Sequence, residues 1–164
     1  MQEILNHEFT TAGAGLRFAI IASRYNDFIT EKLVQGAIDA LLENGVAPAD
    51  IEVFWCPGGL EIPALATRVA RYGSGGKAFH GMVCCGCVIR GETDHYHFVA
   101  EQAMRGVADL ALEAEIAIGN AILTVATVEQ ALERAGEKSC NKGYEAALAA
   151  LAMANQFRTL TKPQ

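Results

Sequence analysis

Three polar segments of the sequence carry side chains that could bind and convert a small molecule. They are residues 23–26 (SRYN), 57–61 (PGGLE) and 90–95 (RGETDH), and each directly follows an apolar run typical of a buried strand. In open α/β sheets, ligands bind outside the carboxyl ends of the parallel strands. These segments are therefore the first candidates for a site, although glycine and polar residues at strand ends also serve simply as turns.

His95 is the side chain best placed for proton transfer. It comes a few residues after the third apolar run, and an imidazole ordinarily titrates near pH ~6.5, so it can accept and give protons at neutral pH. The alternative is a histidine that is hydrogen-bonded for structural reasons. His97 lies two residues on, which turns it away by about 200° on a helix. We interpret His97, His80 and His7 as structural or surface residues.

Gly58 and Gly59 stand between an apolar run and a helical pattern. A backbone without side chains can approach a ligand closely there, and the free N–H groups at a helix N-terminus attract an anion or a carbonyl oxygen. A tight turn between strand and helix would use the same two residues. Glu61 falls in the first helical turn, where the helix dipole favours a carboxylate whether or not it binds a ligand.

Arg134, Lys138 and Lys142 form the only dense group of cations in this acidic chain. The plain interpretation is a helix C-terminus that carries favourable positive charge. The sharper hypothesis is a pocket for a phosphorylated substrate, because arginine makes a forked contact to phosphate and lysine acts as a point charge. Asn141, Lys142 and Gly143 would open a helix there and add backbone donors.

Two other motifs do not favour a ligand. Cys84 and Cys87 have C-x-x-C spacing, but residues three apart in a strand point to opposite faces and could not grip one metal ion. Residues 73–78 (GSGGKA) fit a loose G-x-G-x-x-A pattern, yet they end a helical pattern and precede a strand, the reverse of a dinucleotide-binding turn. We therefore expect no metal site at Cys84 and Cys87, and we expect residues 73–78 to form a surface loop.

Apolar runs alternate with amphipathic helical patterns along the whole chain. This alternation predicts right-handed crossovers and a doubly wound α/β domain, with four parallel strands and helices on both faces. The expected strands are residues 16–22, 51–56, 81–89 and 117–125, with a loose extra strand within residues 8–15.

The composition limits the classes of protein that remain. Thirteen lysines and arginines against nineteen aspartates and glutamates leave a net charge of −6 in 164 residues, of which 51% are hydrophobic. So apolar a chain can fold as a single domain, with a core over about residues 16–157, an N-terminal arm at 1–15 and a tail at 158–164. Its acidity argues against a nucleic-acid partner.

Cysteine usage and the N-terminus bear on location. The five cysteines are an odd number, and Cys56, Cys84, Cys85 and Cys87 lie in apolar runs, so we expect buried, reduced thiols and no disulfide framework. The sequence shows neither a signal peptide nor an apolar run near the ~18 residues of a membrane span. We therefore expect a cytoplasmic protein that does not contact membranes. A mean hydropathy of +0.19 favours a homo-oligomer.

Four separated segments resemble the 6,7-dimethyl-8-ribityllumazine synthase family in order and spacing. They are SRYNDF (23–28), PGGLEIP (57–63), VIRGETDHY (88–96), and ERAG (133–136) with NKG (141–143), within a similarity that runs from about residue 16 to 155. The resemblance implies a flavodoxin-like fold. It also implies the penultimate step of riboflavin biosynthesis, in which 5-amino-6-(D-ribitylamino)uracil and 3,4-dihydroxy-2-butanone 4-phosphate give 6,7-dimethyl-8-ribityllumazine, phosphate and water, without a metal or organic cofactor.

The resemblance implies a role for each matching residue. His95 would be catalytic, moving protons during imine formation, phosphate loss and ring closure. The other matching residues would bind the substrates: Tyr25 by stacking on the pyrimidine ring, with Asn26 beside it; Gly59, Leu60 and Glu61 at the ribityl chain; Cys87, Val88 and Ile89 at the pyrimidine; Glu92, Thr93 and Arg134 at the phosphate; and Lys142 at a uracil oxygen.

Asn120 and Leu60 depart from the family pattern, because members carry an aromatic residue at these positions, many at the first and some at the second. Family members form pentamers with sites shared between neighbours, which implies that Asn120, Arg134 and Lys142 come from the adjacent subunit. Some members build a sixty-subunit shell of pentamers, and the short loop at 136–141 is similar to theirs. The resemblance also implies riboflavin synthase as a partner.

Two alternatives stay open from the sequence. A homologue without catalysis would bind a flavin or lumazine or would only form a shell, and Asn120 favours this hypothesis. A flavodoxin-like flavin carrier would be yellow and redox-active after purification.

Overall fold

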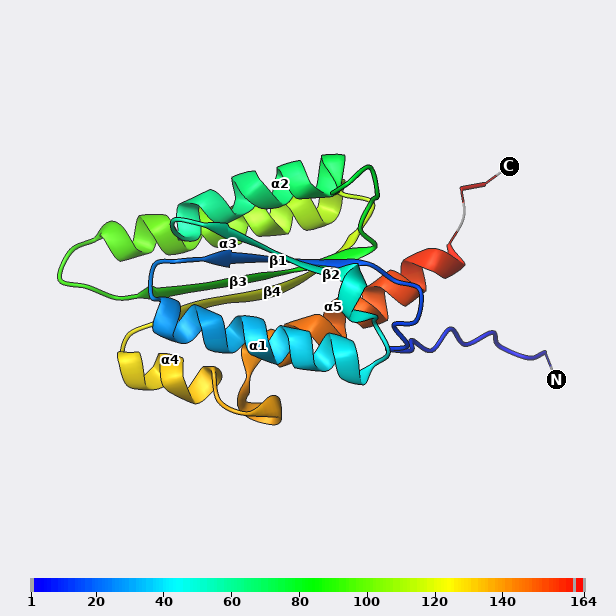
Figure 1. The fold of residues 1–164 in the computed structure, drawn as a ribbon, viewed down its shortest axis with the longest axis horizontal. Helices are drawn as coiled ribbons and strands as arrows, with labels where there is room; N and C mark the ends of the chain where they lie inside the picture. Colours follow the sequence, from blue (N-terminus) through cyan, green and yellow to red (C-terminus); the bar gives the residue numbers. More distant parts are fainter. Residues whose placement is uncertain (1, 161, 164) are drawn as a thin grey trace.

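Four parallel strands form one sheet in the order β2-β1-β3-β4 (Figure 1). The computed structural model describes residues 2–160 and 162–163. The strands are β1 (Phe18–Ser23), β2 (Ile51–Cys56), β3 (Gly81–Ile89) and β4 (Ala117–Val125). The last three have the predicted bounds. β1 instead ends one residue later than predicted, at Ser23, and begins two residues later, because a turn at Gly15 (φ 79°), where Leu16 N–H donates to Gly13 O (3.0 Å), comes first. Since every pairing is parallel, all four strands end at one edge.

Helices cover both faces of the sheet (Figure 1). α2 and α3 lie on one face, and α1 and α5 lie on the other, with α4 beside α1. None of the helices in the described residues has the length and hydropathy needed to cross a bilayer. The helices are α1 (Asp27–Glu43), α2 (Ile62–Tyr72), α3 (His95–Glu113), α4 (Val128–Arg134) and α5 (Lys142–Thr159), with short 3-10 turns η1 (Pro48–Asp50), η2 (Gly59–Glu61) and η3 (Lys138–Cys140).

Alternate residues of the strands feed two separate hydrophobic cores. On β3, Val83 and Cys85 pack toward α1 and α5, whereas Met82 and Cys84 pack toward α2 and α3. Cys87 belongs to the first core, so it lies on the opposite face from Cys84, as the strand spacing predicts. The four cysteines expected to be buried are buried and free. The predicted doubly wound α/β architecture is therefore confirmed.

The N-terminal arm differs from the prediction. Residues 2–17 contain no strand, so the expected extra strand within residues 8–15 is absent. The arm instead follows the end of α5, where Asn155 Nδ2 donates to Thr10 O (3.1 Å) and Ala12 O (2.9 Å), and Gln156 donates to His7 O (2.7 Å). The arm also bonds to Asn44 at the end of α1. Among the described residues it contacts helix ends and pairs with no sheet edge, and a strand requires a partner strand.

The C-terminal tail is shorter than predicted. α5 continues to Thr159, so the first two residues of the expected tail at 158–164 are helical. Leu160 caps the helix, and its backbone N–H donates to Phe157 O (3.2 Å). Residues 161 and 164 of the expected tail lie outside the described residues.

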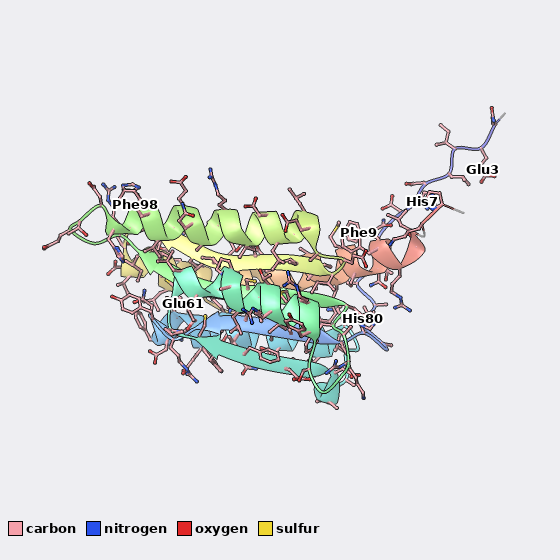
Figure 2. All side chains as sticks on the ribbon, turned by 90° about the horizontal axis from the view of Figure 1, so that it is seen from above. Glu3, His7, Phe9, Glu61, His80 and Phe98 are labelled. Carbon is pink, nitrogen blue, oxygen red and sulfur yellow. The ribbon has the colours of Figure 1, made fainter. Side chains whose placement is uncertain are left out.

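A polar cluster closes the end of the sheet where the strands begin. The backbone N–H of Arg17 donates to Nδ1 of His80 (2.9 Å), and the Arg17 guanidinium pairs with Glu52 and stacks 4.5 Å from the centre of the Phe79 ring. Figure 2 shows His80 at the opposite end of the molecule from Glu61. Nδ1 of His80 can accept the hydrogen bond from Arg17 only when the imidazole is neutral, so this contact depends on pH.

Acidification is expected to weaken the fold through His80. Desolvation of the imidazole, and then the positive charges of Arg158 and Arg17, lower the pKa of His80 from its usual 6.5, against a smaller opposing effect of Asp50. Below pH ~6.5 the unfolded chain therefore binds a proton that the native chain resists, and the free energy of unfolding falls as the pH drops toward the native pKa.

Urea unfolding at several pH values between 5 and 8 tests this expectation for His80. His80→Gln should show a shallower loss of stability on acidification than the parent chain, because the substituted side chain does not titrate. His7→Gln is the matched control, since the exposed arm uses only the backbone oxygen of His7. Equal pH dependence in the parent chain and His80→Gln would contradict the expectation.

Candidate active site

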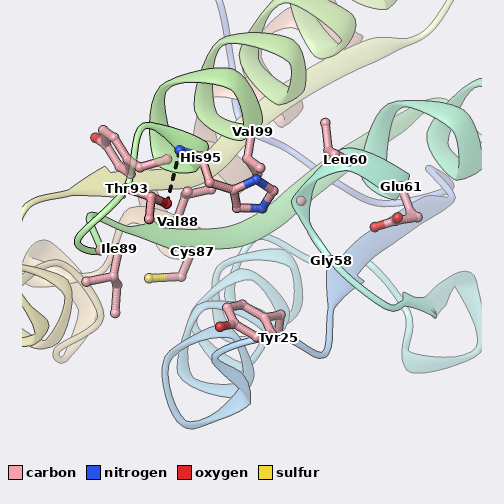
Figure 3. Close-up of a pocket in the computed structure, with 13 residues that line it drawn as sticks. Tyr25, Gly58, Leu60, Glu61, Cys87, Val88, Ile89, Thr93, His95 and Val99 are labelled. Atoms are coloured by element: carbon pink, nitrogen blue, oxygen red, sulfur yellow. Dashed lines mark hydrogen bonds between the residues drawn. The ribbon is translucent and has the colours of Figure 1, made fainter.

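A cleft of about 420 Å³ opens at the edge of the sheet where the strands end (Figure 3). The turns after β1, β2 and β3 all contribute to it, so the three segments predicted to meet do meet. Its volume is in the range of small-molecule sites. The lining residues are Tyr25, Gly58, Gly59, Leu60, Glu61, Cys87, Val88, Ile89, Gly91, Thr93, His95, Tyr96 and Val99.

The turn after β1 presents the Tyr25 ring to the cleft. The backbone N–H of Tyr25 donates to Pro57 O (2.9 Å), which ties this turn to the one after β2. Asn26 then adopts a left-handed conformation (φ 61°, ψ 45°), and its Nδ2 donates to Cys87 O (2.9 Å) on β3. Asparagine tolerates this conformation better than most residues. The Tyr25 side chain is 74% exposed, so a ring face is free to stack on a ligand.

The turn after β2 supplies backbone groups and one carboxylate. Gly58 is extended and the η2 turn begins at Gly59, so the first turn of a helical segment faces the cleft. The Glu61 carboxylate folds back over this turn, and a Cβ placed on Gly58 would lie 3.1 Å from Glu61 Oε2. The site therefore combines backbone donors with a carboxylate acceptor, which suits a ligand rich in hydroxyl groups.

The floor of the cleft is formed by the end of β3. Val88 and Ile89 are half-buried apolar residues, and Cys87 is buried beside them. Burial raises the pKa of the Cys87 thiol to about 11. Burial, and secondarily the charge of Glu61, likewise raise the pKa of Cys56 to about 11. Both thiols are therefore protonated at neutral pH and poor nucleophiles.

His95 is the first residue of α3, and its ring points into the cleft (Figure 3). Its backbone N–H lies 3.4 Å from Thr93 Oγ1, which helps to set the start of the helix. Within the described residues, no hydrogen bond engages the imidazole nitrogens, so both are available to a ligand. His97 lines a different groove, together with Asn120 and Met104, as the helical spacing predicts.

No lysine or arginine side chain of the described residues lines the cleft. The described residues that line it include one carboxylate and one imidazole. Its remaining attraction for an anion comes from the backbone around Gly91 and Thr93 and from the N-terminus of α3. A phosphate bound here would need a positive charge from elsewhere in the assembly.

Five predicted site residues lie outside this lining. Asn26 uses its amide on Cys87 O, and Glu92 stands between two lining residues without lining the cleft itself. Asn120 lies on β4, where its Oδ1 accepts from Ile122 N (2.9 Å) and its Nδ2 lies 3.3 Å from Met104 Sδ. Arg134 ends α4 and Lys142 begins α5, both exposed. Within one chain these last three do not reach the cleft.

Three lining residues, Gly91, Tyr96 and Val99, had not been singled out, whereas Gly58 had been considered as a point where the backbone approaches a ligand. Gly58 and Gly91 belong to the strand-end segments, and Tyr96 directly follows His95. Val99 lies four residues after His95, so the i, i+4 spacing of a helix could have identified it. Tyr96 and Val99 were therefore open to prediction once a helix was placed at His95, and Gly91 from its place in a strand-end segment.

The chain matches one known protein family along most of its length. The family model described as 6,7-dimethyl-8-ribityllumazine synthase matches residues 15–158. The chain is also similar to the 6,7-dimethyl-8-ribityllumazine synthase of Anaeromyxobacter sp. (strain Fw109-5), with 47% identity over 156 residues, which cover 95% of this chain and 93% of the relative. The matched residues include the whole lining of the cleft.

Proposed function

The chain belongs to the 6,7-dimethyl-8-ribityllumazine synthase family, and from this premise we propose that the cleft condenses 5-amino-6-(D-ribitylamino)uracil with 3,4-dihydroxy-2-butanone 4-phosphate. The activity of the family is that of a lumazine synthase in riboflavin biosynthesis, and it is the activity of this chain. We place the reaction in this cleft because Tyr25, Glu61 and His95 all line it.

The ribitylated pyrimidine fits the half of the cleft between the first two strand ends. The exposed ring of Tyr25 offers a stacking face for the pyrimidine, and the backbone of residues 87–89 offers hydrogen bonds to its edge. The turn at residues 59–61 would hold the ribityl hydroxyls through backbone N–H groups and the Glu61 carboxylate. Each contact fixes the amino group of the pyrimidine near His95.

The phosphorylated ketone fits the other half of the cleft. Its phosphate would meet the backbone around residues 91–93 and the N-terminus of α3, whose unpaired N–H groups and dipole favour an anion. Arg134 of an adjacent subunit would complete this site and stabilise the leaving phosphate. Glu92 would contribute through its main chain, which accords with a side chain that does not line the cleft.

His95 would carry protons through the reaction. The amine attacks the ketone, water leaves as the imine forms, phosphate is eliminated, and ring closure expels further water. Each step needs one group that takes a proton and returns it, and an imidazole does both near neutral pH. No step changes the oxidation state of the two substrates taken together, so the proposal requires no redox cofactor. Holding both reactants in one cleft supplies much of the rate.

We propose that the working form is a homo-oligomer, either a pentamer or a sixty-subunit shell of pentamers. The support is that the cleft lacks a cation while Arg134 and Lys142 of the same chain lie exposed elsewhere. Asn120, Arg134 and Lys142 of one subunit would then complete the cleft of its neighbour. The exposed apolar side chains Phe98 (67%) and Leu112 (88%) on α3 provide surface for such contacts.

We also propose a protein partner and a cellular location for this enzyme. Riboflavin synthase, which consumes a lumazine, is the proposed protein partner. A cytoplasmic location is proposed because the four buried cysteines are free thiols, as expected in a reducing compartment.

A product assay tests the function directly. The purified chain, given both substrates, should form a fluorescent lumazine and release inorganic phosphate in equal amounts. The uncatalysed mixture without protein is the reference for the rate. Absence of product above that reference at high protein concentration would overturn the assignment of this reaction to the chain.

A further inference from the structure

A closed loop joins Arg134, at the end of α4, to Lys142, at the start of α5. Ala135 and Asn141 form an antiparallel bridge, and the backbone N–H of Gly136 donates to Cys140 O (3.0 Å) within the loop. Arg134 and Lys142 are the next residues outward on the two sides of this bridge. Within the single chain, Arg134 donates to Gln130 O (3.1 Å) while Lys142 pairs with Glu145 (2.7 Å). The closure of residues 135–141 therefore sets the relative placement of the two cations.

The Asn141 side chain locks this loop against the body of the protein. Asn141 is only 3% exposed, and its amide makes three hydrogen bonds to three different segments. Nδ2 donates to Lys32 O on α1 (3.0 Å) and to Gly136 O across the loop (2.9 Å), while Oδ1 accepts from Tyr144 N at the start of α5 (3.1 Å). One buried amide thus joins α1, the loop and α5.

Two glycines leave room for this junction. A Cβ on Gly36 of α1 would overlap the Asn141 amide, and a Cβ on Gly143 of α5 would overlap the backbone oxygen of Leu33. The helices therefore approach so closely that only glycine fits at both positions. This close contact allows the loop only one position against α1, since a shift would lose both the helix packing and the Asn141 hydrogen bonds.

A second contact holds the tip of the loop. Glu43 at the end of α1 pairs with Lys138 Nζ (2.9 Å) and accepts from the Tyr144 hydroxyl (2.8 Å). Lys138 has a positive φ of 34°, which is unfavourable for a residue with a side chain and persists only where surrounding contacts hold it. The pKa of Glu43 is lowered by the hydrogen bonds from Lys138 and Tyr144, so this contact stays charged at neutral pH.

We propose that Asn141 is a positioning residue of the enzyme: by clamping residues 135–141 onto α1, it fixes Arg134 and Lys142 where the substrates of a neighbouring cleft require them. Glu43 supports the same clamp from the other end of the loop. This inference rests on the proposed function, in which the two cations contact the phosphate and a uracil oxygen. Misplacement of a binding group by about 1 Å can cost about a hundredfold in rate.

Asn141→Asp is the direct test. An aspartate still accepts from Tyr144 N, but it cannot donate to Lys32 O or Gly136 O, and it places negative charge against both oxygens. We expect kcat/KM for the phosphorylated ketone to fall by about a hundredfold, mainly through KM. Competitive inhibition by inorganic phosphate should weaken in parallel, which a loss of stability alone would not cause.

Asn155→Asp is the matched control. Asn155 lies on α5, the helix that Asn141 caps, and its Nδ2 also donates to backbone oxygens, those of Thr10, Ala12 and Leu151. This substitution should lower the free energy of unfolding while leaving KM and the phosphate inhibition constant unchanged. Equal effects of the two variants on phosphate inhibition would overturn the proposal, because both would then act through stability.

A double-mutant cycle separates this inference from the proposed function. If Asn141 acts through Arg134, Asn141→Asp should hardly change phosphate inhibition in an Arg134→Gln background. Additive effects would overturn the positioning role. Should Arg134→Gln alone leave phosphate inhibition unchanged, the proposed phosphate contact itself would be wrong, whatever Asn141 does.

Glu43→Ala covers the case in which Asn141→Asp does not fold. Glu43 has a side chain 41% exposed at a helix end, so its removal should leave folding intact while freeing the tip of the loop. We expect weaker phosphate inhibition in the same direction as for Asn141→Asp, but smaller. Unchanged inhibition in Glu43→Ala, when Asn141→Asp does not fold, would overturn the clamp.

Discussion

Replacing His95 with glutamine is expected to lower kcat by roughly a hundredfold, because general acid–base catalysis by one side chain contributes about that much or more. Among the described residues that line the cleft, His95 carries the only imidazole, the side-chain type most often used for proton transfer in catalysis. The neighbouring thiol of Cys87 cannot replace it, since burial raises its pKa to about 11. Glutamine keeps polar atoms in the cleft but cannot relay a proton.

The fold should survive this change. His95 is exposed at the first position of α3, and its ring makes no hydrogen bond within the described residues, so urea unfolding of His95→Gln should match the parent chain. His97→Gln is the control, because His97 lines a separate groove two residues further along the helix. A comparable loss of kcat in both variants, or unfolding of His95→Gln, would show that His95 is structural.

Much of the fold could be predicted because its signals are local. β2, β3 and β4 are mainly apolar runs followed by Pro57, Arg90 and Ala126, and the helical stripes between them fix the crossovers. The segments after β1, β2 and β3 then meet for a geometric reason, since parallel strands end at one edge. The candidate site therefore followed from strand order without any knowledge of side-chain contacts.

The remaining features depend on contacts between distant segments. Residues 141 and 32 meet through the Asn141 amide, and His80 accepts from Arg17, although no local pattern marks either pair. Asn26 shows the same limit: the resemblance implies a ligand contact for it, but nothing in the sequence indicated that its amide also donates to Cys87 O. The N-terminal strand failed for a related reason, because strand formation requires a neighbouring edge that the single chain does not offer to residues 8–15.

Mixed assemblies of two impaired variants are expected to regain activity. Arg134→Gln should lower kcat/KM by about a hundredfold, because the leaving phosphate loses its forked cationic partner. His95→Gln is impaired for a different reason, because it removes the proton-relay group that the other subunit contributes to the shared site. In a random one-to-one assembly, about one quarter of the clefts would combine His95 of one chain with Arg134 of its neighbour, half of the positions multiplied by half.

Coexpression of the two variants, followed by a rate assay per subunit, measures this recovery. The control pairs His95→Gln with Glu61→Gln: both residues line the cleft of one chain, so no mixed assembly restores a complete cleft and activity should stay low. Recovery with Arg134→Gln but not with Glu61→Gln would show that the cation comes from the neighbour. If the first pair recovers no more than the second, each site is contained in one chain and the shared-site proposal is wrong.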